Sequence, residues 1–257
     1  MADIYQEIVR IREEGGEAAL ATIVSASGST PREEGAKMLV RADGSIAGTI
    51  GGGSLEAQVI KEALKVIGEG KPKQLHFSLT AKEVEDEGML CGGEAEVFIE
   101  PILTTPTLYI FGGGHISLPL AKTGKLLGFK TAVIDDRAEF ANTNRFPEAD
   151  TVIAEDFGKS FSRLKIDKSS YIVIVTRNHQ YDDLVLEWAV GTRAKYIGMI
   201  GSKKKTKAVF DHLMTKGITK EQLARVHAPI GVEIGAQTPE EITVSILAEI
   251  IKVRRSS

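Results

Sequence analysis

The sequence has little of several residue types, and each shortage excludes a class of protein. Its 257 residues include one cysteine, Cys91, so the chain forms no internal disulfide and no cysteine-rich zinc site, and we expect a cytoplasmic location. Its 32 basic and 35 acidic residues give a net charge of −3, which argues against nucleic-acid and membrane-surface partners. The apolar run at 18–26 is too short to span a membrane and contains Thr22 and Ser25. An ordinary share of hydrophobic residues, 42%, predicts a globular protein.

The length and one short polar segment predict two domains. At about 150 residues per domain, the chain holds one large domain or two small ones. The segment Thr104-Thr105-Pro106 interrupts the apolar pattern, and its proline cannot continue a strand. The sequence pattern also changes after it. We therefore predict one domain over residues 1–104 and a second over residues 105–257.

The first domain has the pattern of a small α/β domain. Asp3 is a suitable N-cap for a first helix, which the glycines at 15–16 end. The dipeptide Asp43-Gly44 predicts a hairpin turn between two short strands. The expected strands are residues 18–25, 37–41, 45–49, 74–79 and 95–103, and a second helix covers 55–68.

The second domain alternates between apolar strands and helices. Buried parallel strands separated by helices predict a Rossmann-like, doubly wound parallel sheet covered on both faces. Thr238, Pro239 and Glu241 form a capping box with proline at the first helical position, so a last helix begins there. The expected strands are 107–111, 130–135, 151–154, 171–176, 196–200 and one near 225–228, and a helix covers 115–127.

A glycine-rich turn follows the first of these strands. Gly112 and Gly114 match the first two glycines of a dinucleotide fingerprint, in which the backbone approaches a pyrophosphate at a helix N-terminus. His115 extends this turn, and Asp135 ends the next strand, where an acid accepts a hydrogen bond from a ribose hydroxyl. Ser117 replaces the third glycine. The turn therefore either binds a nucleotide, with NAD and NADP both open, or serves only to pack the sheet against the helix.

Two further segments follow strands of the same sheet. Residues 176–179 contain His179, which is a candidate site residue or a loop residue. Residues 201–205 place three lysines in the first turn of a helix, where they oppose the helix dipole unless an anion binds. A solvated basic face explains the same lysines.

The first domain contains glycine-rich loops that are suited to binding an anion. It also contains the single thiol of the chain. Glycine loops such as 51–53 expose backbone N–H groups, and Arg32 offers a forked donor for phosphate or carboxylate. Structural tight turns produce similar sequences. Cys91 precedes two glycines in a polar segment; it is either a small buried hydrophobe or an accessible thiolate that contacts a soft metal.

Several strings together resemble the XdhC/CoxI proteins, the accessory factors of molybdenum hydroxylases. The matches occur in order along nearly the whole chain. In the first domain they are Gly28–Arg32, Gly35–Met38, Gly48–Glu56, Cys91–Gly93 and Glu96–Pro101. In the second domain they are Phe111–His115, Asp135–Arg137, Gly198–Ser202, His227–Gly231 and Gly235–Ile242.

The resemblance implies a non-catalytic carrier. Such a protein binds the molybdenum cofactor (molybdopterin) and assists its sulfuration and insertion into an apo molybdenum hydroxylase of the xanthine dehydrogenase type. It further implies that Cys91 contacts the cofactor, with molybdenum as the metal. The expected cofactor-binding residues are Cys91, Arg32, Gly51, Gly52, Gly53, Gly112, Gly114, His115 and Asp135. A cysteine desulfurase and a second copy of the chain, in a homodimer, are the further expected partners.

Two other functions compete with this one. The Rossmann-like domain alone is compatible with an NAD(P)-dependent oxidoreductase in which His115 or His179 is the acid/base, although the third fingerprint glycine is missing. A scaffold that binds a partner and no ligand is the third hypothesis. Co-purification of molybdenum and a pterin would favour the carrier, whereas NAD binding with hydride transfer would favour the enzyme.

Overall fold

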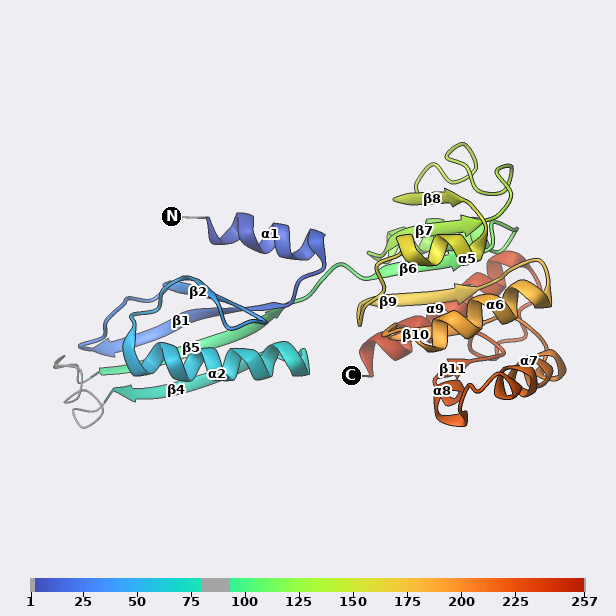
Figure 1. Ribbon diagram of the computed structural model, residues 1–257. Coiled ribbons are helices and arrows are strands. Elements are labelled where there is room, and N and C mark those ends of the chain that lie inside the picture. The colour runs from blue at the N-terminus through green and yellow to red at the C-terminus, as the bar shows by residue number, and fades with distance from the viewer. Residues whose placement is uncertain (1–2, 80–92, 257) are drawn as a thin grey trace. The chain divides into compact units, whose positions relative to one another are not determined.

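The protein consists of two compact units, each with its own sheet (Figure 1). The structure is a computed structural model and describes residues 3–79 and 93–256. Contacts along the chain divide it into Met1–Thr105 and Pro106–Ser257. Within the described residues, every helix is too short or too polar to cross a membrane.

The first unit contains a five-stranded antiparallel sheet in the order β3-β2-β1-β5-β4. Its central strands β1 and β5 pair over their whole length, from Ala18 opposite Ile102 to Gly28 opposite Gly93. The strands are β1 (Ala18–Gly28), β2 (Lys37–Arg41), β3 (Ile46–Gly48), β4 (Lys73–Leu79) and β5 (Gly93–Ile102). Strand β1 is three residues longer than the sequence predicts, because the pairing with β5 continues past a register shift between Ile23 and Ser25.

Two helices pack against this sheet through different residues of β1. Helix α2 (Gly53–Glu69) buries Leu55, Val59, Ala63 and Val66, one face of the helix, against alternate strand residues that include Ala19 and Ala21. Helix α1 (Ile4–Glu14) packs through Ile11 with Ala18 and Leu39. Asp3 caps α1 by accepting from the Tyr5 N–H at 3.0 Å, as the sequence predicts.

The second unit contains a six-stranded parallel sheet in the order β11-β10-β9-β6-β7-β8. The strands are β6 (Thr107–Phe111), β7 (Lys130–Asp135), β8 (Thr151–Ala154), β9 (Ser170–Ile174), β10 (Tyr196–Met199) and β11 (Val226–His227). The chain adds β7 and β8 on one side of β6 and then crosses to add β9 on the other side. This reversal between β6 and β9 is the switch point of a doubly wound sheet, where ligands bind in such folds.

Helices cover both faces of the parallel sheet (Figure 1). On one face, α6 (His179–Val190), α7 (Lys203–Thr215) and α5 (Phe157–Ser160) pack on alternate strand residues such as Phe111. On the other, α4 (Ser117–Leu126) and α9 (Pro239–Arg255) pack on their neighbours, such as Ile110. The short elements η1 (Phe161–Arg163) and α8 (Lys220–Ala224) complete the unit. The predicted small α/β region followed by a Rossmann-like sheet is thereby confirmed.

One helix boundary differs from its prediction at the glycine turn. Helix α4 begins at Ser117, two residues later than the sequence indicates, so Gly114, His115 and Ile116 belong to the turn. The Ser117 hydroxyl donates to the carbonyl of Gly112 at 2.6 Å. Ser117 is thus buried as a hydrogen-bonding residue of the turn in the place where the dinucleotide fingerprint has a third glycine.

Candidate functional site

The predicted glycine loops of the first unit meet at one end of its sheet. Gly28, at the end of β1, pairs with Gly93, at the start of β5. A Cβ on Gly93 would lie 2.6 Å from the carbonyl oxygens of both Ser27 and Ser29, so only glycine permits this approach. The second loop, residues 49–54, joins them through Gly51, whose added Cβ would lie 2.4 Å from the Pro31 side chain.

Glu56 from α2 already uses part of the second loop. Its Oε1 accepts from the Ile50 N–H at 3.0 Å and from the Thr49 hydroxyl. Burial alone would raise the pKa of the Glu56 carboxyl, but donation from Thr49 and from three loop N–H groups outweighs burial and lowers that pKa. These N–H groups belong to Gly52, Ile50 and Gly51. The loop therefore holds an internal carboxylate, and its remaining N–H groups lie at Gly53 and in the first turn of α2.

Arg32 is an exposed cation in the first of these loops. Its side chain is exposed, and its guanidinium makes no hydrogen bond or ion pair with the residues that the structure describes. Cys91 lies outside the described residues. It precedes Gly93 by two positions in the sequence, and Gly93 starts β5 at the same end of the sheet as Gly28 and Gly51.

In the second unit, the Gly112 turn lies at the switch point of the sheet. Gly112 has φ +110°, and a Cβ there would lie 2.4 Å from the carbonyl oxygen of Val175, just after β9. Gly113 also has no room for a side chain, since its added Cβ would lie 2.1 Å from the Phe140 carbonyl oxygen. Gly114 is half-buried but has no atom within 4 Å of an added Cβ, and His115 is exposed. A ligand can therefore approach the turn at Gly114 and His115.

Asp135 lies where the sequence places it, at the end of β7, but its carboxylate is engaged. The residue is 2% exposed and accepts from the Gly113 N–H at 2.8 Å. Arg137 donates to both carboxylate oxygens, from Nε at 2.9 Å and from Nη2 at 3.0 Å, and its own N–H also donates. A ribose hydroxyl would have to compete with this bidentate pair for the same oxygens.

Three arginines around the turn were not predicted as site residues. Arg137 lies over the Phe140 ring at 3.7 Å, and Arg145 donates from Nε to the Gly113 carbonyl at 3.1 Å. Arg177, after β9, pairs with Asp136 through both carboxylate oxygens. The available signal was position, because Arg137 and Arg177 each follow a strand at the edge where such sheets bind ligands.

The ion pair between Asp136 and Arg177 predicts that the second unit loses stability in acid. Two hydrogen bonds from Arg177, aided by the Tyr181 hydroxyl, lower the pKa of Asp136 to about 2. A carboxyl whose folded pKa is depressed stabilises the fold above its unfolded pKa and loses that contribution as the pH falls towards the folded one. We expect the second unit to lose stability between about pH 4 and pH 2, and Asp136→Asn to lose less over this range. Urea unfolding followed by Trp188 fluorescence measures this; equal losses in both proteins would contradict it.

The remaining predicted segments have structural partners. Asn178 caps α6 by accepting from the Tyr181 N–H at 3.0 Å, which places His179 at the first position of the helix. Lys205 pairs with Asp182, so one of the three lysines at the start of α7 is neutralised. Among residues 3–79 and 93–256, no three His, Cys, Asp or Glu side chains are arranged to hold a metal ion.

An antiparallel unit with clustered glycine loops, followed in the chain by a Rossmann-type unit with a glycine turn at its switch point, defines a two-unit α/β protein. Two family models match this arrangement. The model for the XdhC Rossmann domain matches residues 108–250, and the XdhC and CoxI family model matches residues 11–78. The chain belongs to the XdhC and CoxI family.

The chain is similar to curated relatives and to solved structures. The uncharacterized protein YqeB of Escherichia coli (strain K12) is 39% identical over 99% of this chain and 47% of its own length. A probable xanthine dehydrogenase subunit from Bacillus subtilis (strain 168) is 31% identical over 62% of this chain and 46% of its own. The molybdenum cofactor insertion chaperone PaoD of Escherichia coli (strain K12) is 25% identical over 99% of this chain and 90% of its own. The chain thus spans about half the length of the first two.

One similar solved structure is a crystal structure described as a xanthine dehydrogenase from Bacillus halodurans. It aligns with a TM-score of 0.53 at 25% identity and covers 100% of this chain and 96% of its own. Both units of the protein therefore have counterparts within one known chain.

Proposed function

We propose that the protein is an accessory factor that holds the molybdenum cofactor and assists its insertion into an apo molybdenum hydroxylase of the xanthine dehydrogenase type. One observation carries this proposal. The family match extends through both units, and PaoD, a molybdenum cofactor insertion chaperone, aligns over 99% of the chain. The cofactor is cargo in this role, and the protein need not turn it over.

The loop end of the first unit has donors that suit such a cargo. Molybdopterin ends in a phosphate and holds its metal through a soft dithiolene. Arg32, exposed and unengaged among the described residues, and the N–H groups at Gly53 offer donors to the phosphate, next to Gly51 and Gly52. Cys91 would supply a thiolate, which is the ligand type that soft metal centres prefer. The Glu56 carboxylate holds the loop by accepting from the N–H groups of Ile50, Gly51 and Gly52.

We also propose a location and further partners for the protein. We place the protein in the cytoplasm as a homodimer, and we assign to it a part in sulfuration of the cofactor together with a cysteine desulfurase. The single cysteine supports a reducing compartment. Size-exclusion chromatography with light scattering measures the oligomeric state.

A nucleotide or NAD(P) at the Gly112 turn is the second ligand that we propose. Gly112 lies at the switch point, and the open approach at Gly114 and His115 supports binding there. The Asp135 carboxylate would take part only if Arg137 released one of its oxygens. The oxidoreductase hypothesis would need, in addition, hydride transfer with His115 or His179 as the acid/base.

Loss of the thiol is expected to remove molybdenum from the purified protein. Produced in a cell that makes the cofactor, the Cys91→Ala variant should carry several-fold less molybdenum per chain than wild type, since a thiolate contact to the metal is lost. Metal analysis by mass spectrometry, with pterin fluorescence after oxidation, measures the loading. Cys91→Ser should behave like the alanine variant, because a hydroxyl does not replace a thiolate as a soft ligand. Unchanged loading in both would contradict a role for Cys91.

A second pair of variants tests the anion site independently. Arg32→Gln should lower pterin loading, whereas Arg12→Gln should not. Arg12 is also exposed but lies in the last turn of α1, which precedes the opposite end of β1. The two substitutions remove the same charge from the same unit, so a difference between them reports on the loop end.

A further inference from the structure

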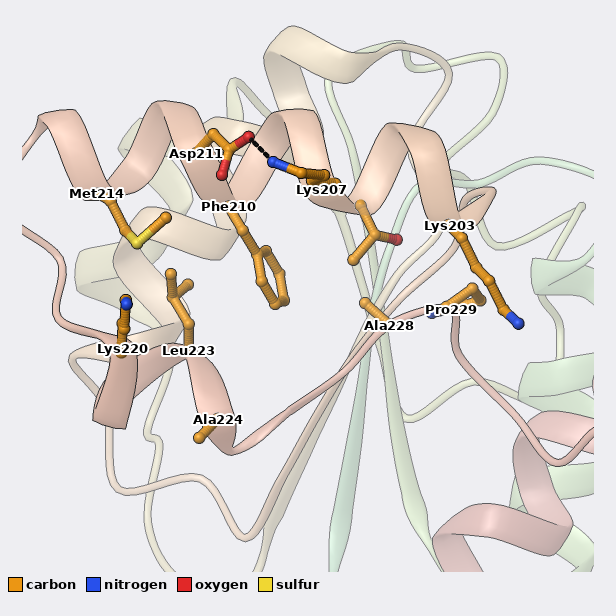
Figure 2. Close-up of a pocket in the computed structure, with 11 residues that line it drawn as sticks. Lys203, Lys207, Phe210, Asp211, Met214, Lys220, Leu223, Ala224, Ala228 and Pro229 are labelled. Atoms are coloured by element: carbon orange, nitrogen blue, oxygen red, sulfur yellow. Dashed lines mark hydrogen bonds and ion pairs between the residues drawn. The ribbon is translucent and has the colours of Figure 1, made fainter.

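We propose that a groove along α7 of the second unit docks an acidic, amphipathic segment of a partner protein. The groove has a volume of about 470 Å³ and lies between α7, α8 and the chain that follows β11 (Figure 2). It belongs to neither the loop end of the first unit nor the Gly112 turn. No residue that lines the groove is among the proposed cofactor-binding residues.

The middle of the groove is apolar. Phe210 and Met214 come from one face of α7, one helical turn apart, and Leu223 comes from α8. Ala228 and Pro229 continue the floor beyond β11. Phe210 and Met214 are only partly buried by their own fold, although they pack against its core. Aromatic and methionine side chains in this state are typical anchors of protein interfaces.

The ends of the groove are basic. Lys203 lies at the end of the groove where Pro229 lies, and Lys220 lies at the other end, where Leu223 and Met214 lie (Figure 2). Both side chains are exposed, and neither forms an ion pair with any residue in the described part of the chain. Lys207 does have a partner, since its Nζ lies 2.6 Å from Asp211 Oδ2. Three lysines and one aspartate line the groove, so its net charge is +2.

The length of the groove along α7 selects the occupant. Lys203 and Met214, the residues of α7 at the two ends, are eleven positions apart, which corresponds to about 16 Å along a helix. A single phosphate or carboxylate on a small molecule cannot reach both ends. A helical segment of about ten to twelve residues, or an extended segment of about five, can, with apolar side chains on the floor and acidic residues towards each lysine. The complementary partner is therefore an acidic segment with apolar anchors.

The inference rests on the proposed function for the choice of partner, because the apo hydroxylase is the protein in which the segment is sought. The test uses the full chain and the apo hydroxylase of the same organism, produced in a strain that makes no molybdenum cofactor. Binding is measured by surface plasmon resonance at low and at high salt. We expect Lys203→Glu/Lys220→Glu to weaken the affinity at least tenfold at low salt, and Phe210→Ala to weaken it at both salt concentrations.

A matched variant controls for net charge. Lys122→Glu/Lys252→Glu makes the same change on α4 and α9, which pack on the other face of the sheet, and should keep the wild-type affinity. The four lysines are exposed, so their replacement leaves the core intact. If Lys203→Glu/Lys220→Glu and Phe210→Ala bind as tightly as wild type, the groove is not the docking site, while the proposed function stands.

A photo-crosslink identifies the occupant directly. Replacement of the exposed Ala224, at the groove margin, by p-benzoylphenylalanine should crosslink to one hydroxylase peptide that carries acidic residues around apolar ones. A crosslinked peptide that is basic or uncharged overturns the proposal. If wild type binds no hydroxylase at all, the groove proposal fails; the molybdenum content of the purified protein then decides separately whether the carrier function fails with it.

Discussion

Gly113→Ala is expected to destabilise the second unit by about 3 kcal/mol, at the upper end of the range for overpacked sites. The added Cβ would lie 2.1 Å from the Phe140 carbonyl oxygen, and a backbone atom cannot rotate away as a flexible side chain can. The Phe140 segment is itself fixed, since Arg145 donates to the Gly113 carbonyl at 3.1 Å and Arg137 lies over the Phe140 ring. For a unit of this size the loss corresponds to a fall in Tm of about 6 to 12 °C.

Gly114→Ala is the matched control for this substitution. Nothing lies within 4 Å of a Cβ at Gly114, and its φ is not positive, so the alanine should leave the Tm within about 2 °C of wild type. Trp188, the single tryptophan of the chain, lies in α6 and reports unfolding of the second unit by its fluorescence. Equal Tm values for the two variants would contradict the close packing at Gly113.

This pair of glycines also separates packing from binding at the turn. At Gly112 and Gly113 neighbouring backbone atoms leave no room for a Cβ, whereas no atom lies within 4 Å of an added Cβ at Gly114. If a nucleotide approaches the turn, Gly114→Ala should lower its affinity without changing stability. Isothermal calorimetry with NAD(P) measures that effect, and an unchanged affinity would remove Gly114 from the proposed contacts.

Most of the fold could be predicted because its signals are local. The alternation of apolar strands and helices after Pro106 predicts a parallel sheet, and the structure contains one of six strands. The capping box at Thr238 depends on residues within one turn, and both of its hydrogen bonds are present. Such features require no knowledge of what the rest of the chain brings near.

The site was harder to predict because its contacts join distant segments. The sequence places Asp135 correctly at a strand end, but it does not show that Arg137 and the Gly113 N–H occupy its oxygens. Glu56 could be seen as a helix cap, yet its hold on the 50–52 loop depends on how that loop folds back on α2. A carboxylate competes for the same donors that a ligand would use, and the sequence alone does not decide which acceptor the fold supplies.

Lys205→Met is expected to cost the second unit about 3 to 5 kcal/mol, the range found when one partner of a buried ion pair is removed. Asp182 is 0% exposed, and its Oδ2 lies 2.5 Å from the Lys205 Nζ. Its other oxygen accepts from the Thr176 hydroxyl at 2.7 Å. This single hydrogen bond does not offset the free-energy cost of burying a carboxylate without a counter-charge. Methionine keeps the length and apolar contacts of the lysine stem, so the loss reports on the charge.

The two partners of this pair should behave unequally, because only one of them can reach water. Lys205 is 31% exposed, so after Asp182→Asn its ammonium can hydrate, and the loss should be smaller than for Lys205→Met. The double variant Asp182→Asn/Lys205→Met removes both charges and should be more stable than Lys205→Met alone.

The control is Lys204→Met, which replaces an exposed lysine in the same turn of α7 and should change stability by less than about 0.5 kcal/mol. Urea unfolding of the four variants, followed through Trp188, gives the coupling energy. A double variant no more stable than Lys205→Met would mean that the buried carboxylate finds another partner when its lysine is removed.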